Sequence, residues 1–229
     1  FDTFETGSSI ISSDDLYGGS IRLFDSIEKR NGITLKYTDT SDIGNVERAP
    51  DDAGRSGPHA AAVDIETPSN PTMLITDIRK TAELAHKHNV LLIVDNTFLT
   101  PYFQQPFALG ADIVIQSGTT FLCGHNDTLA GFITTDSDTL AEKISFVSKT
   151  TGAGLSPFDS FLTVRGIKTL AVRMEAQQKN AQEIVAWLSI HPDIKKVLYP
   201  GLTNHPGYEV NKSQTTGSGS MMSFYVDTV

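Results

Sequence analysis

Polar side chains follow two apolar runs of the sequence at the point where each run ends. Asp95 comes directly after residues 90–94, and residues 117–120 follow the run at 111–115. A buried carboxylate is costly unless it is paired, so Asp95 is either a cap or turn residue or the counter-ion of a buried cation such as a protonated pyridine nitrogen. The second segment can hold an anion through its hydroxyls and backbone N–H groups, or it can be only a polar turn; its hydroxyl residues are Ser117, Thr119 and Thr120.

Two further side chains have settings that suit a flat ligand. Tyr17 opens a Tyr-Gly-Gly turn, where a tyrosine can lay its ring on a ligand or can be an ordinary surface or core residue. Asn70 lies in a segment with Pro68 on one side and Pro71 on the other. Because proline fixes the local backbone, the Asn70 amide can be aimed at a ligand, although a plain turn explains the same residues.

Composition excludes several classes of protein. The net charge is −9, and the lysines and arginines are scattered without a basic stripe, which argues against a nucleic-acid partner. No apolar run reaches the roughly 18 residues of a membrane span, and the acidic start does not resemble a signal peptide. We predict no metal, because no His, Cys and carboxylate cluster has ligand spacing; His86 and His88 are interpreted as a helix-dipole partner and a solvated residue.

The chain has one cysteine, Cys123, which cannot form an internal disulfide. This favours a reducing, cytoplasmic location. Without a partner motif for a nucleophile, we interpret Cys123 as a small buried hydrophobic residue.

Strands and helices that could position these residues alternate along the chain. The run at 90–94 is short and β-branched, which predicts a central parallel strand buried on both faces, and similar strands are predicted at 111–115 and 129–134. A weaker strand at 62–66 carries an unexpected Asp64. Further strands are predicted at 9–12 and 33–37, helices at 20–30, 39–48 and 76–88, and a long helical region with interruptions at 156–188. This alternation is typical of an α/β fold whose ligands bind past the carboxyl ends of a mostly parallel sheet.

Residues 49–62 are predicted to be a surface loop, because prolines and glycines interrupt regular structure there. In the long helical region, the expected core residues are Leu170, Met174, Ile184, Val185, Trp187 and Leu188. His191 and Pro192 should end it. We therefore expect a large domain over 1–190 and the start of a smaller C-terminal domain over 191–229, with both ends of the chain reading as cuts through a longer protein.

Several stretches occur together and in the order of a known family. They are residues 12–19 (Ser-Ser-Asp-Asp-Leu-Tyr-Gly-Gly), 66–71 (Glu-Thr-Pro-Ser-Asn-Pro), 94–98 (Val-Asp-Asn-Thr-Phe), 156–160, 165–170 and 199–207. The chain resembles the Cys/Met-metabolism family of pyridoxal-phosphate enzymes, which includes cystathionine γ-synthase, cystathionine γ-lyase, cystathionine β-lyase and methionine γ-lyase. The resemblance implies the aspartate-aminotransferase-like (type I) pyridoxal-phosphate fold, an α/β fold with helices flanking the sheet.

The resemblance also assigns expected roles to the polar residues. Asp95 matches the partner of the pyridine nitrogen, Tyr17 the residue that stacks on the ring, and Asn70 the partner of its phenolic oxygen. Thr97 matches a residue beside the ring. Ser117 and Thr119 match the hydroxyls that hold the phosphate.

Thr120 occupies the position of the family's Schiff-base lysine. The family signature runs from an aspartate through a strand to Ser-x-Thr-Lys, an aromatic residue and Gly-His, and the chain matches it without a gap from Asp112 to His125 except at Thr120. A threonine forms no imine and is a poor base, so the resemblance implies at most noncovalent cofactor binding and strongly reduced turnover. An engineered trap, a natural pseudoenzyme and a damaged copy all fit the substitution.

The implied activity is transsulfuration, with γ-elimination or γ-replacement on cystathionine or a related sulfur amino acid. Gly19 stands where methionine γ-lyases keep a cysteine, which favours the cystathionine γ-synthase and γ-lyase branch. The alternatives are a non-catalytic cofactor-binding relative and an incomplete fragment. Family resemblance further implies a homo-oligomer, namely a tetramer.

Overall fold

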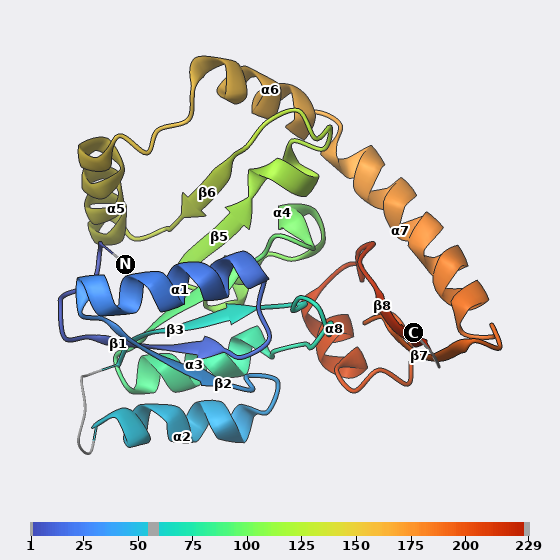
Figure 1. The fold of residues 1–229 in the computed structure, drawn as a ribbon, viewed down its shortest axis with the longest axis horizontal. Helices are drawn as coiled ribbons and strands as arrows, with labels where there is room; N and C mark the ends of the chain where they lie inside the picture. Colours follow the sequence, from blue (N-terminus) through green and yellow to red (C-terminus); the bar gives the residue numbers. More distant parts are fainter. Residues whose placement is uncertain (1, 55–59, 227–229) are drawn as a thin grey trace.

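The computed structural model describes residues 2–54 and 60–226, which contain a six-stranded central sheet (Figure 1). Its strands are β1 (Ser9–Ser13), β2 (Thr34–Thr38), β3 (Ala60–Glu66), β4 (Leu91–Asp95), β5 (Ile113–Ser117) and β6 (Gly131–Thr134). They are ordered β2-β1-β3-β4-β5-β6, and β1 to β5 are parallel whereas β6 is antiparallel to β5. The mostly parallel α/β architecture predicted from the sequence is confirmed.

Helices cover both faces of this sheet. Those nearest to it are α1 (Gly18–Asn31), α2 (Ile43–Gly54), α3 (Ile78–Lys87) and α5 (Asp138–Thr151), and the shorter α4 (Thr100–Phe103), η1 (Pro106–Leu109) and η2 (Gly118–Leu122) follow individual strands. The buried residues of α3 are Ile78, Thr81, Ala82 and Ala85, which lie at helical spacing on one face. Asp77 caps this helix by accepting a hydrogen bond from the backbone N–H of Lys80 at 3.0 Å.

The strand side chains divide into two cores because alternate residues point to opposite faces. On one face, Val63, Leu92 and Val114 pack with the apolar residues of α3. On the other face, Ala62, Ile93 and Ile113 pack with Leu140 and Ile144 of α5. The strand at 90–94 is thus buried on both sides, as the sequence predicted.

The chain reverses its direction of travel across the sheet between β1 and β3. It passes from β1 outward to β2, and then returns to the other side of β1 as β3. Figure 1 shows α1 on one side of the sheet and α2 and α3 on the other, as right-handed crossovers in opposite directions require. Such a switch point opens a crevice at the carboxyl ends of the strands.

Two helices and a small second sheet complete the chain. Helices α6 (Pro157–Ile167) and α7 (Leu170–Leu188) run along the outer side of the molecule toward β7 (Ile194–Leu198), α8 (Tyr208–Gln214) and β8 (Ser223–Val226) (Figure 1). Strands β7 and β8 form an antiparallel pair. Tyr199 packs against Ala181 and Val185 of α7. The division into domains at residue 190 stays a prediction.

Three expectations about these elements are wrong in part. Residues 49–54 belong to α2, which begins at Ile43 and continues through Pro50, and β3 begins at Ala60; residues 55–59 of the expected loop lie outside the described residues. A proline inside a helix removes one hydrogen bond, at a cost of roughly 3 kcal/mol, but does not forbid the helix.

The second expectation was a buried parallel strand at 129–134. Strand β6 is instead an exposed antiparallel edge, because the segment from β5 doubles back through η2 and does not cross over the sheet.

The third error concerns the core of α7. Met174, Val185 and Leu188 are buried there, as expected, but Ile184 and Trp187 are 49 % and 57 % exposed. The buried residues repeat at intervals of three, four and seven positions, and Ile184 and Trp187 fall beside that stripe.

Cys123 is fully buried, as expected, and its Sγ lies 3.3 Å from Oγ1 of Thr163.

Candidate active site

One cavity of about 390 Å³ brings together every site residue predicted from the sequence. It lies where β3, β4 and β5 end and α1 begins. Its lining includes the seven predicted residues Tyr17, Asn70, Asp95, Thr97, Ser117, Thr119 and Thr120, together with Glu66, Phe98 and Leu129. The crevice expected from the sheet topology is therefore present on the described part of the chain.

The strand register explains why these side chains meet. Glu66 is the Cα partner of Asp95, and Asp95 is the partner of Ile115. Ser117 lies two residues beyond Ile115 and so points to the same face. All three polar residues continue the face that carries Ala62, Ile93 and Ile113, and they form the floor of the cavity where that apolar face ends.

Asp95 is held by its neighbour Thr97. The backbone N–H of Thr97 donates to Oδ1 of Asp95 at 2.9 Å, and the backbone N–H of Ser117 donates to Oγ1 of Thr97 at 2.8 Å. Burial raises the pKa of Asp95, while the hydrogen bonds from Thr97 lower it. The carboxyl group is thus destabilised as an anion when nothing cationic lies beside it, which suits a counter-ion site.

Tyr17 lies at the mouth of the cavity and is 56 % exposed. Its backbone N–H donates to Oε2 of Glu66 at 3.0 Å, and its carbonyl accepts from the backbone N–H of Ser20 at 2.8 Å. Its ring lies against Gly19, where an added Cβ would be 2.3 Å from Cε1 of the ring. The second glycine of the turn therefore leaves the space that the ring fills.

Asn70 stands in a loop that is fastened to the segment after β1. The hydroxyl of Ser69 donates to the carboxylate of Asp15, and Thr72 donates to the same oxygen through its N–H at 3.1 Å and its hydroxyl at 2.6 Å. Both proline bonds of the loop, at Pro68 and Pro71, are cis. The hydrogen bonds to Asp15 hold the backbone on either side of Asn70.

The hydroxyl segment after β5 differs in one respect from expectation. The backbone N–H groups of Gly118 and Thr119 both donate to the carbonyl of Ala130, at 2.7 and 3.2 Å, so they are committed to β6 rather than offered to an anion. The hydroxyl of Thr119 also exchanges hydrogen bonds with the backbone of Ala130. Ser117 and the exposed Thr120 line the cavity beside it.

Glu66, Phe98 and Leu129 line the cavity without having been assigned a role from the sequence. A signal for Glu66 was present: an acidic residue ends a strand of small and branched apolar residues and is followed by Thr-Pro. Burial first, and then the nearby Asp95, raise its pKa to about 8 against the lowering effect of the hydrogen bond from the Tyr17 N–H. Leu129 is 79 % exposed and carried no such signal.

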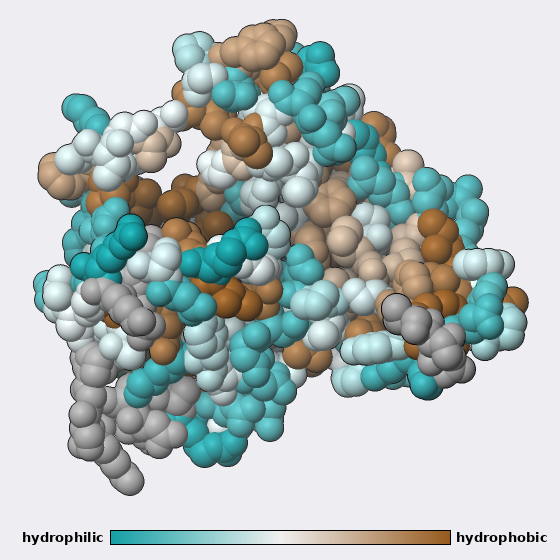
Figure 2. Space-filling model, in the orientation of Figure 1, coloured by the Kyte–Doolittle hydropathy of each residue, from teal (hydrophilic) through white to brown (hydrophobic). Residues whose placement is uncertain are grey.

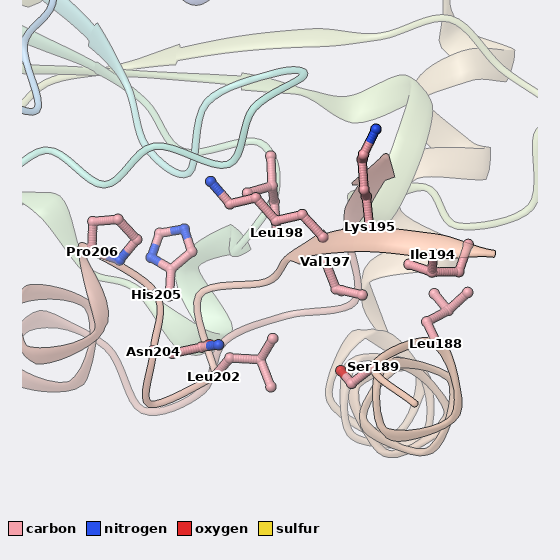
Figure 3. A pocket seen from close by; sticks show the side chains of 11 residues that line it. Leu188, Ser189, Ile194, Lys195, Val197, Leu198, Leu202, Asn204, His205 and Pro206 are labelled. Carbon is pink, nitrogen blue, oxygen red and sulfur yellow. The ribbon is translucent and has the colours of Figure 1, made fainter. Parts of the chain in front are cut away.

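A second cavity, of about 190 Å³, lies between the end of α7 and β7 (Figure 3). Its lining mixes apolar side chains with the polar residues Ser189, Lys195, Lys196, Asn204 and His205. Among the described residues no group of three or more His, Cys, Asp or Glu side chains could hold a metal ion.

The fold and the cavity define an α/β protein of the aspartate-aminotransferase-like (type I) class. A family model described as Cys/Met metabolism PLP-dependent enzyme matches residues 1–229. The chain belongs to this family. It is 47 % identical to a cystathionine gamma-lyase of Bacillus subtilis (strain 168) over 221 residues, which is 96 % of the chain and 57 % of that protein.

A cystathionine beta-lyase of Lactococcus lactis subsp. cremoris is also 47 % identical, again over 96 % of the chain and 57 % of the relative. Among solved structures, the cystathionine gamma synthase of Xanthomonas oryzae pv. oryzae in complex with cystathionine superposes with a TM-score of 0.93 at 37 % identity, covering 98 % of the chain and 56 % of that structure. The type I fold predicted from the resemblance is confirmed. The chain spans about half the length of the relatives it matches.

Proposed function

We propose that the chain is part of a pyridoxal-phosphate-dependent transsulfuration enzyme acting on cystathionine or a related sulfur amino acid, with turnover impaired by Thr120. The observation that carries the proposal is the single cavity in which a buried carboxylate, an exposed tyrosine ring, an amide and several hydroxyls converge. Relatives named as cystathionine lyases and synthases match nearly the whole chain, which supports the substrate class.

The residues present fit the ring of the cofactor. Asp95, whose pKa is raised in the absence of a cation, would pair with the pyridine nitrogen, and Tyr17 would cover the ring face. Asn70 and Thr97 would contact the ring from the loop after β3 and from the end of β4. When bound, the protonated ring acts as an electron sink for a carbanion at the α-carbon of the substrate.

The fit at the phosphate end is incomplete. Ser117 offers a hydroxyl, whereas the hydroxyl of Thr119 is already hydrogen-bonded to the backbone of Ala130. The residues that line the cavity include two carboxyl groups, of Glu66 and Asp95, and no cation. A phosphate dianion needs compensating positive charge. We infer that groups outside this cavity lining, in the same protein or in a second subunit, supply that charge.

Thr120 determines how the cofactor is held. Its exposed side chain lies in the cavity wall, where the family's signature has a lysine. A hydroxyl cannot form an imine and is too weak a base to move protons between substrate carbons. The cofactor is therefore bound noncovalently, and the proton transfers of γ-elimination lack their usual base.

The test is an absorbance spectrum of the purified chain with pyridoxal phosphate, before and after borohydride, with peptide mass mapping. We expect the spectrum of a bound free aldehyde, without reductive attachment to one lysine. The variant Thr120→Lys should give a visible imine band and attachment in the peptide that contains position 120. Attachment of the unsubstituted chain at one specific lysine would contradict the noncovalent proposal.

A non-catalytic relative is the second candidate, and Thr120 is the observation that favours it. The two candidates differ in the response to Thr120→Lys. An impaired enzyme should gain cystathionine turnover in the full-length protein, whereas a cofactor-binding pseudoenzyme should bind without such a gain. An incomplete fragment of the family should fail to bind in either form.

The choice among lyase and synthase activities stays open within this proposal. Gly19 still argues against the methionine enzyme, because methionine γ-lyases keep a cysteine at this position. The β-lyase relative is as similar to the chain as the γ-lyase relative is. Turnover of cystathionine, followed by identification of the keto acid that is released, separates the β- from the γ-reaction.

We also propose that the protein is a homo-oligomer, a tetramer by resemblance. Helix α6 exposes Phe158, Phe161 and Val164 at 69 %, 62 % and 59 %, and Figure 2 shows hydrophobic residues on the surface where Figure 1 places α6. Exposed apolar clusters of this kind often mark protein interfaces.

No helix among the described residues is long and apolar enough to cross a bilayer. The cytoplasmic location inferred from the cysteine content stays a prediction.

A further inference from the structure

Glu66 connects the floor of the candidate site to its mouth. It ends β3 as the neighbour of Asp95, and it is 6 % exposed. Its Oε2 accepts the hydrogen bond from the backbone N–H of Tyr17 at 3.0 Å. One carboxyl group therefore ties the strand that borders Asp95 to the turn that carries the tyrosine ring.

The backbone of Tyr17 is held from both sides. Its carbonyl accepts hydrogen bonds from the N–H groups of Ser20 and Ile21 and so belongs to the first turn of α1. Its N–H lies outside that turn, and Tyr17 caps the helix with no side-chain hydrogen bond of its own. Glu66 supplies the contact on this side. With both peptide groups fixed, the ring position depends only on the side-chain torsions and on the space above Gly19.

We propose that Glu66 is a positioning residue, which holds Tyr17 where its ring can cover a planar ligand seated beside Asp95. The inference rests on the proposed cofactor-binding role of the cavity. Glu66 acts through the Tyr17 backbone, so removing its acceptor oxygen weakens ligand binding only as long as the tyrosine ring is present.

The protonation state of Glu66 suits this role. Burial raises its pKa to about 8, with further contributions from the neighbouring acids Asp95, Asp64 and Asp15. Near neutral pH the group is therefore mainly the neutral acid, whose carbonyl oxygen still accepts the Tyr17 N–H. A glutamine side chain has the same size and offers the same acceptor.

The test measures the affinity of the full protein for pyridoxine 5′-phosphate, which has no aldehyde and cannot attach to a lysine. Glu66→Gln should bind within about twofold of the unsubstituted protein, whereas Glu66→Ala should bind about tenfold more weakly, as expected for a lost buried hydrogen bond. Glu66→Asp, whose shorter side chain cannot reach the same N–H, should also bind weakly and serves if Glu66→Ala does not fold. The circular dichroism of the ligand band should weaken in parallel.

A double-mutant cycle with Tyr17→Ala separates positioning from direct contact. In that background Glu66→Ala should cost little further affinity, because the ring through which it acts is gone. Asp64→Asn, on the same strand and face but outside the cavity lining, is the matched control and should change affinity less than about twofold. Additive losses, or equal affinity of Glu66→Ala and the unsubstituted protein, would overturn the proposal. Absence of binding by the unsubstituted protein would instead overturn the proposed function.

Discussion

Glu66 and Asp95 are register partners on neighbouring parallel strands, and both carboxyl groups open into one cavity. Burial raises the pKa of each, and Asp95 raises that of Glu66 further. Two acids placed so closely favour different protonation states. Glu66, with a pKa of about 8, keeps its proton at neutral pH. This arrangement leaves Asp95 as the group that becomes the anion when a cation binds beside it.

Asp95→Asn should weaken binding of pyridoxine 5′-phosphate at least about tenfold, since hydrogen bonds to a charged partner contribute roughly 1.5–3 kcal/mol. The same variant should make the ligand-free chain more stable, because it removes a carboxyl group that burial disfavours. Affinity is measured by isothermal titration calorimetry and stability by urea denaturation.

Asp193→Asn is the control for Asp95→Asn, because the Asp193 side chain is 83 % exposed and is not part of the cavity lining. It should change neither the affinity for pyridoxine 5′-phosphate nor the stability of the ligand-free chain. A variant at Asp95 that binds the ligand as tightly as the original chain would show that the carboxylate is not the partner of the ring nitrogen.

Much of this site followed from the sequence because its residues sit at the ends of recognisable strands. The apolar run before Asp95 and the glycines after Tyr17 are local signals, and the parallel topology brings such ends together. What the sequence could not supply depends on contacts between distant segments. The N–H groups of Gly118 and Thr119 donate to Ala130 because β6 runs back antiparallel to β5. Trp187 is exposed because of the rotation of α7 about its axis.

Asp64 should make the stability of the chain depend on pH. Its pKa rises from 3.8 to about 7, because burial outweighs the hydrogen bond that Ser12 donates to it at 3.0 Å. Between these values the folded chain holds a proton that the unfolded chain has lost. The free energy of unfolding therefore falls as pH rises through this window and levels off above it. The pKa of Glu66 rises from 4.5 to about 8, so this group also makes the free energy of unfolding fall as the pH rises.

Asp64→Asn stays neutral at every pH and can still accept the hydrogen bond from Ser12. Near pH 8 it should raise the melting temperature by about 2–4 °C or more, which corresponds to about 1 kcal/mol for a chain of this size, and near pH 4 the two chains should melt together. Thermal melts across this range provide the measurement. A difference between the two chains that does not change with pH would refute this assignment.

Gly166 marks a close contact between α6 and the segment after η2. A Cβ added there would lie 2.1 Å from the backbone oxygen of Cys123. Alanine is favoured over glycine inside a helix by about 1 kcal/mol, yet Gly166→Ala should destabilise the chain by about 1–3 kcal/mol because the backbone must move. Gly18→Ala in α1 is the matched control, with nothing within 4 Å of the new Cβ, and it should not destabilise. Urea denaturation of both variants, compared with the unsubstituted chain, measures these changes in stability.

The exposed apolar side chains of α6 should hold copies of the chain together. In the double variant Phe158→Glu and Phe161→Glu, charges replace two rings that are 69 % and 62 % exposed, so folding should be unaffected while association is lost. Size-exclusion chromatography with light scattering should give a smaller species than the unsubstituted protein, with an unchanged far-ultraviolet circular dichroism spectrum. Leu23→Glu on α1, where the leucine is 48 % exposed, is the control and should leave the mass unchanged. If the unsubstituted protein is already a monomer at micromolar concentration, or if the double variant keeps its mass, α6 is not the interface.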